Sequence, residues 1–226
     1  MSGGQEIVAQ VEKIVRERLK DRSHDFEHTK RVYKIALKLA KHYPNVNLLA
    51  LRLAALLHDI AREEEDRDKT GRVDHAIRSA EIAREILQNL GVESSIIESV
   101  VHAIETHRFK KNRKPRTIEA KLLFDADKID VLGAVGIARC FMTAGRYGQN
   151  PWELDFDPEK YVRENMPTGR IKNISKHNPY KEFVIKLVKV PERMQTEVGR
   201  KVAEERLKFM MEFFERFKRE VKVEDM

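Results

Sequence analysis

The spacing of apolar residues constrains the fold of this chain more than any other feature. In seven segments, apolar side chains recur three or four positions apart, which places them on one face of an α-helix. These segments are 5–20, 26–43, 47–63, 74–90, 93–108, 116–143 and 192–219. No long alternation of Val, Ile and Thr with polar residues indicates a sheet. We therefore predict an all-α fold, in which the helix over 116–143 is interrupted near Gly133.

The segment 145–179 departs from this pattern, because it contains three glycines and four prolines. Its composition predicts long loops with one short helix, as either a substrate-shaping insertion or a packed surface excursion. A chain of 226 residues is long enough for one substantial core. We therefore predict a single domain over 1–226, with its core at about 20–143 and a C-terminal helical part, 180–219, packed on that core.

Charge and composition narrow the classes of ligand and location. The chain has 44 Lys and Arg against 37 Asp and Glu, a net charge of +7, which favours anionic ligands. So many ionised residues with a single cysteine, Cys140, are typical of a thermophilic source. A membrane span needs about 20 consecutive apolar residues, and we find neither such a run nor an apolar signal core near the start. We therefore expect a cytoplasmic protein with no intrachain disulfide and no membrane association.

A His-Asp pair, His58 and Asp59, ends the apolar run 51–57 in a segment predicted to be a buried helix. A buried polar pair costs several kcal/mol unless a partner satisfies it, and a divalent cation is an efficient partner. His28 and Asp127 also have apolar neighbours three or four positions away, so they face inward on their own helices. Inward polar residues on three helices can converge in a bundle. Because Asp59 points about 100° away from His58 on a regular helix, it reaches a shared ion only from a helix end.

These residues and their flanking motifs resemble the HD superfamily of metal-dependent phosphohydrolases, whose pattern is H…HD…D. The residues that match this pattern are, in order, His28, His58, Asp59 and Asp127. The match extends through a DADxxD motif at 125–130 and a GAxGxAR motif at 133–139, which is similar to one bacterial and archaeal subfamily of uncharacterised HD hydrolases. The resemblance covers about residues 20–217.

The resemblance implies an HD-domain helical bundle with a loop-rich insertion and a long C-terminal helix. It also implies one divalent ion per chain, held by His28, His58, Asp59 and Asp127. Such mixed nitrogen and oxygen ligands suit Mn, Mg, Fe, Co, Ni or Zn, and the sequence does not choose among them. The ion would polarise a phosphoryl oxygen or lower the pKa of a bound water, and Asp59 would take part in catalysis beside it.

Basic residues near this set are candidates for binding phosphates. Arg31 lies one turn after His28, which places it well for this role. The further candidates are Lys121, Lys128 and Arg139. Asp130, one turn after Asp127, either positions a water or orients a ligand. A Lys or Arg near Asp130 can instead pair with that carboxylate.

The general base is less clearly marked in the sequence. Other HD hydrolases place a catalytic Glu shortly after the doublet, whereas here the third residue past Asp59 is Arg62. Glu63, the first of three consecutive glutamates, is therefore our prediction for the base. The structural alternative is that this acidic run is a solvated helix end.

Two more histidines bear on the number of ions. The two-metal phosphodiesterases of the superfamily add histidines between the doublet and the last Asp, and His75 resembles one of them. His107 has apolar neighbours that place it on an inward face. We predict one ion, with His75 and His107 lining the substrate pocket, and a second ion as the alternative. His102 lies about 140° around the helix from His107, so both cannot face one ion from a regular helix. His24, His42 and His177 are expected to be surface or capping residues.

The leading functional hypothesis is hydrolysis of a nucleotide, most directly of a nucleoside triphosphate to its monophosphate and pyrophosphate. A 5′-nucleotidase, an alarmone hydrolase or a cyclic-nucleotide phosphodiesterase is the alternative within the superfamily. The rival outside enzymes is a nucleic-acid-binding or regulatory protein with a structural metal site. The single basic cluster at 110–114 has no interleaved aromatic residues, which argues against nucleic acid. The aromatic residues of 209–217 favour packing in the core or between two copies, so a homodimer is an open alternative.

Overall fold

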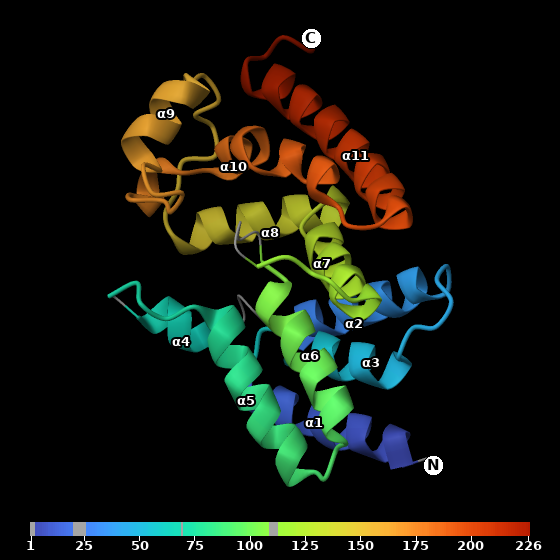
Figure 1. The fold of residues 1–226 in the computed structure, drawn as a ribbon. Helices are drawn as coiled ribbons and strands as arrows, with labels where there is room; N and C mark the ends of the chain where they lie inside the picture. Colours follow the sequence, from blue (N-terminus) through green and yellow to red (C-terminus); the bar gives the residue numbers. More distant parts are fainter. Residues whose placement is uncertain (1–2, 20–25, 69, 109–112) are drawn as a thin grey trace. The chain divides into compact units, whose positions relative to one another are not determined.

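The computed structural model describes residues 3–19, 26–68, 70–108 and 113–226, and it is built from helices (Figure 1). The α-helices are α1 (Gly3–Arg18), α2 (Phe26–Ala40), α3 (Leu48–Leu57), α4 (Arg62–Arg67), α5 (His75–Asn89), α6 (Ser94–Thr106), α7 (Ile118–Asp130), α8 (Gly133–Arg146), α9 (Pro158–Asn165), α10 (Pro179–Ile185) and α11 (Glu197–Val221). Three 3₁₀ turns accompany them, η1 (Ile174–Lys176), η2 (Leu187–Lys189) and η3 (Pro191–Arg193). The described residues contain no strand, so the all-α prediction is confirmed.

The predicted helix boundaries hold except at two places. The helix predicted over 47–63 was too long, because α3 ends at Leu57 and the chain turns before α4 begins. The helix predicted from 192 begins at Glu197, after the turn η3. The expected interruption near Gly133 is present, between α7 and α8. His24 and residues 110–112 of the basic cluster lie outside the described residues.

Glycine is required where α8 begins. Gly133 has a φ of +71°, a conformation that other residues adopt only at a cost. At Gly136, an added Cβ would lie 2.1 Å from the carbonyl oxygen of Val131, so any side chain there would force the backbone apart. The two glycines of the GAxGxAR motif are thus explained by the sharp turn between α7 and α8.

The chain divides into two compact units. The first comprises residues up to Asp127 together with Gln195–Gly199, and the second comprises Lys128–Met194 and Arg200–Met226. The single-domain organisation remains a prediction.

Helix α3 is the centre of the first unit. It packs against α1, α2 and α6, while α5 and α6 pack along each other. Its side chains Leu51, Leu53 and Leu57 are fully buried. The helix begins at the cap Asn47, whose side chain accepts a hydrogen bond from the backbone N–H of Ala50 at 3.0 Å. Because α3 is buried and begins at a defined cap, the residues at its C-terminal end lie at a fixed place in the core.

A buried carboxylate holds the segment Gln195–Gly199 in the first unit. The Asp125 carboxylate accepts hydrogen bonds from the backbone N–H of Gln195 at 2.8 Å and of Thr196 at 2.9 Å, and from the Thr196 hydroxyl at 2.5 Å. Asp125 is fully buried. An added Cβ on Gly199 would lie 2.3 Å from Asp125 Oδ2, so only glycine allows this close approach. The first Asp of the DADxxD motif therefore attaches the start of α11 to this unit.

The second unit has an aromatic core. Phe183 and Phe214 stack with their ring centroids 4.6 Å apart, and Phe214 is buried. Phe217 stacks on Trp152, which is 62% exposed, at 5.7 Å. The predicted packing role of the C-terminal aromatic residues is thus confirmed for Phe214. The loop-rich segment 145–179 contains the single short α-helix α9 and the turn η1, as predicted.

One histidine of the second unit is a cap, as predicted, but does not lie at the surface. The backbone N–H of His177 ends the turn η1 by donating to the carbonyl oxygen of Ile174 at 3.1 Å, and its side chain is buried between two polar partners. Its Nε2 lies 2.6 Å from Glu182 Oε2 and its Nδ1 lies 2.7 Å from the Tyr161 hydroxyl oxygen. Burial raises the pKa of Glu182, but the hydrogen bond from His177 and the charge of Lys186 outweigh burial. The pKa of Glu182 therefore lies below its usual value. No periodic pattern surrounds His177, because its partners come from the separate helices α9 and α10.

Candidate metal centre

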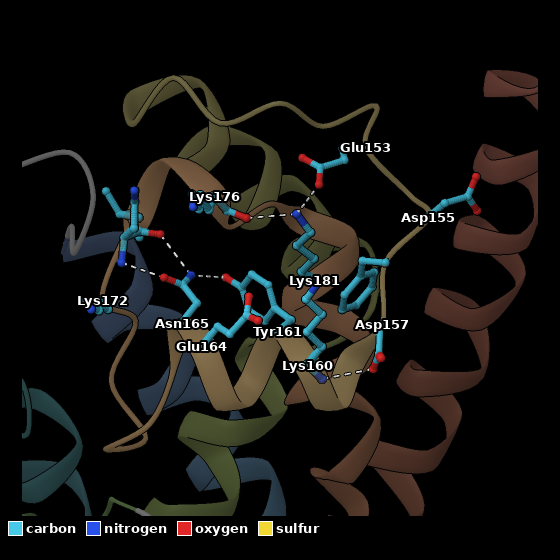
Figure 2. Close-up of a pocket in the computed structure, with 13 residues that line it drawn as sticks. Glu153, Asp155, Asp157, Lys160, Tyr161, Glu164, Asn165, Lys172, Lys176 and Lys181 are labelled. Atoms are coloured by element: carbon cyan, nitrogen blue, oxygen red, sulfur yellow. Dashed lines mark hydrogen bonds and ion pairs between the residues drawn. The ribbon is translucent and has the colours of Figure 1, made fainter.

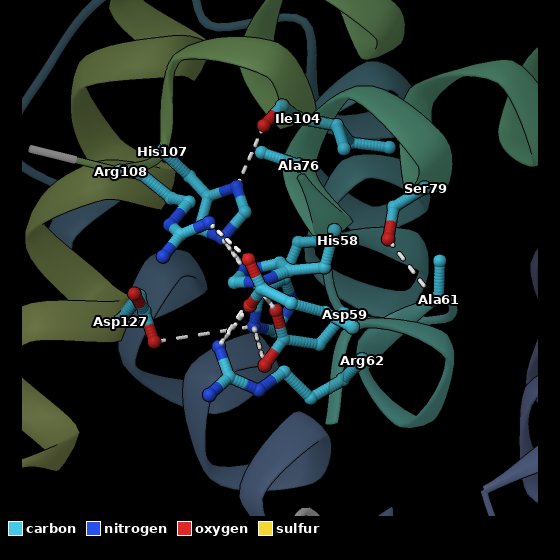
Figure 3. Close-up of polar contacts among 12 residues, drawn as sticks. His58, Asp59, Ala61, Arg62, Ala76, Ser79, Ile104, His107, Arg108 and Asp127 are labelled. Atoms are coloured by element: carbon cyan, nitrogen blue, oxygen red, sulfur yellow. Dashed lines mark hydrogen bonds and ion pairs between the residues drawn. The ribbon is translucent and has the colours of Figure 1, made fainter. Parts of the chain in front are cut away.

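The end of α3 brings His58 and Asp59 to one point (Figure 3). On a regular helix the two side chains would diverge, but here the helix stops at Leu57 and the chain turns. The backbone N–H of Ile60 donates to the carbonyl oxygen of Leu57 at 3.2 Å, and that of Arg62 donates to the carbonyl oxygen of Asp59 at 2.9 Å. Asp59 Oδ2 consequently lies 3.8 Å from His58 Nε2. Asp59 thus lies at a helix end, as expected, and its role as a ligand remains a prediction.

Residues of α2 and α7 complete this cluster. His28 Nε2 lies 3.8 Å from Asp59 Oδ2 and 3.4 Å from Asp127 Oδ1, and His58 Nε2 lies 4.0 Å from the same Asp127 oxygen. Ligand atoms of His28, His58 and Asp59 all lie within 4.8 Å of one another, the spacing of side chains that can share one ion. All four residues are buried. The structure thus brings together the four residues that the sequence singled out.

The hydrogen bonding of this cluster fits a cation. His58 Nδ1 lies 2.9 Å from the carbonyl oxygen of Ala55 and must donate to it, so Nε2 carries the lone pair. His58 Nε2 and Asp59 Oδ1 are both buried without a hydrogen-bond partner. Facing lone pairs and carboxylate oxygens repel one another unless a positive charge lies between them. The residues present therefore fit a divalent ion.

The protonation states of His58 and Asp59 also favour a bound cation. Burial lowers the pKa of the His58 imidazole, although Asp59 and Asp127 raise it in part. Burial raises the pKa of Asp59, but the imidazoles of His58 and His75 more than offset this and hold it well below its usual range. Neutral imidazole and ionised carboxylate are the forms that bind metal ions.

A second group of ligand atoms shares Asp59. His75 Nε2 lies 3.2 Å and His107 Nε2 lies 3.5 Å from Asp59 Oδ1. Ligand atoms of these three residues also lie within 4.8 Å of one another. His107 Nδ1 donates to the carbonyl oxygen of Ile104 at 2.6 Å, and burial lowers its pKa to about 4, although Asp59 raises it in part. The sequence placed His75 and His107 in a substrate pocket, whereas the structure places both against Asp59.

The comparisons with known proteins agree with this geometry. The HD domain family model matches residues 25–132, which contain every residue of both groups. The solved structure of a predicted HD superfamily hydrolase from an uncultured Thermotogales bacterium is 32% identical, covers 94% of this chain and 91% of its own, and superposes with a TM-score of 0.62. The chain belongs to the HD superfamily.

Further known proteins are similar to this chain over most of their length. An HD-superfamily hydrolase from Bacillus thuringiensis is 30% identical, with 96% of this chain and 97% of that chain covered and a TM-score of 0.68. The uncharacterized protein YpgQ of Bacillus subtilis is 28% identical over 203 residues, which are 88% of this chain and 84% of YpgQ. A crystal structure of YpgQ in complex with ADP covers 96% of both chains with a TM-score of 0.71. None of the helices in the described part of this HD-superfamily chain has the length and hydrophobicity to cross a membrane.

The glutamates that follow the HD doublet, residues 63–65, have different partners. Glu63, our predicted general base, accepts a hydrogen bond from Arg67 at 2.7 Å. Glu65 instead lies 2.6 Å from His75 Nδ1 and accepts a hydrogen bond from Arg108 at 2.8 Å. Sequence reasoning missed Glu65, because three consecutive glutamates differ only in helical phase. The base assignment of Glu63 remains a prediction for this HD-superfamily chain.

The predicted phosphate-binding residues fall in both units. Arg31 on α2 and Lys121 on α7 are half-buried in the first unit. Lys128, Asp130 and Arg139 belong to the second. There the Arg139 guanidinium donates to the buried Asp130 carboxylate at 2.8 Å, the pairing that the sequence left open. The substrate-binding and catalytic roles of these five residues remain predictions.

The second unit also contains a hollow (Figure 2). It has a volume of about 930 Å³ and carries side chains of both charges. The buried Lys181 ammonium beside it donates to Glu153 Oε1 at 2.9 Å and to the carbonyl oxygen of Lys176 at 3.0 Å. The Lys181 ammonium thus has its partners within the protein.

Proposed function

We propose that this protein is a metal-dependent phosphohydrolase that acts on a nucleotide, converting a nucleoside triphosphate to its monophosphate and pyrophosphate. The observation that carries the proposal is the pair of partnerless buried atoms, His58 Nε2 and Asp59 Oδ1, inside a cluster of converging ligands. The ADP bound to the relative YpgQ supports a nucleotide as the substrate class. The net charge of +7 supports an anionic substrate.

His28, His58, Asp59 and Asp127 would hold the ion. When bound, a divalent cation polarises a phosphoryl oxygen and makes a water more acidic. The chain's own residues fix the geometry for this chemistry. The bond from His58 Nδ1 to the Ala55 carbonyl orients that imidazole, and burial keeps bulk water from the ligand atoms. In the proposed reaction, water adds at the α-phosphorus, the bond to the bridging oxygen breaks, and pyrophosphate leaves with that oxygen.

The second group around Asp59 favours one alternative, a two-ion phosphodiesterase acting on cyclic nucleotides. Both functions are tested by one experiment. Purified protein is supplied in turn with Mn, Mg, Co, Ni and Zn and a panel of nucleoside mono- and triphosphates and cyclic nucleotides, with Asp127→Ala as the control. We expect pyrophosphate release from triphosphates that vanishes in the variant. Ring opening of cyclic nucleotides alone would favour the phosphodiesterase, and no turnover with metal bound would contradict both.

Replacing Arg31 tests substrate binding separately from the ion. Arg31→Ala removes a guanidinium one turn from His28 and leaves every ligand of the cluster in place. Because a charge-assisted hydrogen bond to phosphate contributes about 1.5–3 kcal/mol, we expect kcat/KM to fall about 10-fold or more with unchanged metal content. Steady-state kinetics beside metal analysis measures both, and an unchanged kcat/KM would show that Arg31 is structural.

A further inference from the structure

The loop-rich segment of the second unit, together with the start of α10, forms the hollow shown in Figure 2. Every residue that lines the hollow lies between Glu153 and Lys181, so the hollow belongs wholly to this unit. Its volume of about 930 Å³ is in the range of sites that bind small molecules. The proposed phosphohydrolase reaction uses none of these residues, so the hollow is a candidate site of its own.

Lysine ammonium groups at the hollow have donors to spare. In the described part of the chain, no ion pair or hydrogen bond engages the exposed side chains of Lys160, Lys172 and Lys176. The ammonium of the buried Lys181 donates to Glu153 Oε1 at 2.9 Å and to the Lys176 carbonyl oxygen at 3.0 Å. Because an ammonium has three N–H donors, one N–H of Lys181 has no oxygen or nitrogen acceptor among the described residues.

The carboxylates at the hollow are mostly engaged. Three of the four already have a partner, namely Glu153 with Lys181, Asp155 with Lys222 at 3.2 Å, and Asp157 with the backbone N–H of Lys160 at 3.0 Å, where it caps α9. Glu164 is the remaining one, and it faces three ammonium groups that have no ion pair within the described residues. The unpaired charge at the hollow is therefore positive, which favours an anionic ligand.

The backbone that carries Lys172 is held in place by the buried Asn165. The backbone N–H of Lys172 donates to the Asn165 carbonyl oxygen at 2.7 Å. The Asn165 side chain holds the next residue, Asn173, because it accepts from the Asn173 N–H at 2.8 Å and donates to the Asn173 carbonyl oxygen at 3.1 Å. The carbonyl of Lys176 is held in turn by the buried Lys181 ammonium. Two lysines are thus fixed at the hollow before a ligand arrives, which reduces the entropy cost of binding.

We propose that the hollow binds an anion with two or more linked phosphoryl groups, held by Lys160, Lys172, Lys176 and the remaining N–H of Lys181. A lysine ammonium is a compact point charge that binds phosphate oxygens well. Several ammonium groups around a hollow of this volume suit an extended anion better than a single phosphate ion. The anion is either a free oligophosphate or the phosphate chain of a nucleotide, since the lysines recognise the phosphates in both. The inference does not rest on the proposed function, because the lining contains no residue of the candidate metal centre.

Calorimetric titration of the whole, metal-free protein with sodium tripolyphosphate tests the site. We expect wild type to bind the probe, and the double variant Lys172→Ala, Lys176→Ala to bind it with a Kd raised about 10-fold or more, because charge-assisted hydrogen bonds are lost. The double variant Lys189→Ala, Lys208→Ala is the matched control. It removes the same charge from two exposed lysines of the second unit that do not line the hollow, so it should bind as wild type does.

Methyl NMR of the isoleucines locates the bound probe without any variant. Ile174 lines the hollow, so its methyl resonance should shift when tripolyphosphate is added to wild type. The same shift with ATP would support a nucleotide as the source of the phosphates, and a shift with tripolyphosphate alone would support a free oligophosphate.

Three results would overturn the inference. These are no binding of tripolyphosphate by wild type, an unchanged Kd in Lys172→Ala, Lys176→Ala, and binding that leaves the Ile174 resonance unmoved. Since neither a metal ion nor turnover enters the test, failure here leaves the proposed function intact. Failure of the proposed function likewise leaves this inference intact.

Discussion

Asp59→Ala should leave a folded protein that binds no divalent ion and lacks the proposed phosphohydrolase activity. Asp59 is the one residue common to both ligand groups, with Oδ2 facing His28 and His58 and Oδ1 facing His75 and His107. A metal ion contributes several kcal/mol of transition-state stabilisation, so we expect the rate to fall on the order of 10³-fold or more. Metal analysis of the purified variant, together with product release at saturating Mn²⁺, measures both effects.

Asp155→Ala is the matched control for this change. Its side chain is 77% exposed and pairs with Lys222 at 3.2 Å. The same loss of one carboxylate at this position should change neither metal content nor rate, because surface ion pairs contribute little. Metal retained at the wild-type level in Asp59→Ala would contradict the assignment of the site.

Asp125→Ala should destabilise the protein by about 3–5 kcal/mol, even though Asp125 lies only two residues from a proposed metal ligand. The substitution leaves two backbone N–H groups and the Thr196 hydroxyl without their acceptor in a buried place. Urea unfolding followed by circular dichroism measures the change in the free energy of unfolding.

The conservative variant distinguishes the lost hydrogen bonds from a lost packing contact. Asp125→Asn keeps the size of the side chain and one acceptor oxygen, so we expect it to destabilise the protein by less than Asp125→Ala does. Metal binding at saturating Mn²⁺ should persist in both variants if they are folded. An unfolding free energy equal to that of wild type in Asp125→Ala would contradict the attachment role.

The three acidic residues of the DADxxD motif illustrate how neighbouring positions acquire different roles. Asp125 binds the backbone at the start of α11, Asp127 faces His28 in the ligand cluster, and Asp130 pairs with Arg139 in the second unit. Helical phase explains the division, since residues two apart on a helix point in different directions and residues three apart lie one turn along. The DADxxD motif alone therefore does not predict which of its three carboxylates lies in the ligand cluster.

The sequence by itself determined the properties that depend on local periodicity and residue chemistry. Apolar spacing was enough to predict the all-α fold and the interruption near Gly133. It was also enough to place His28, His58 and Asp127 on inward faces, because the apolar residues three and four positions away define the buried face of each helix. The motifs around them carried the resemblance to the HD superfamily, which the comparisons confirmed.

Only the tertiary structure decided which groups meet across space. Helical phase did not predict that α3 would stop at Leu57 and turn both His58 and Asp59 inward. Nothing local separates Glu65 from Glu63, yet only one of them faces His75. The burial of His177 depends likewise on partners from two other helices. In each case the physical reason is the same, because hydrogen bonds between distant segments form only after packing of the apolar faces has set the distances between helices.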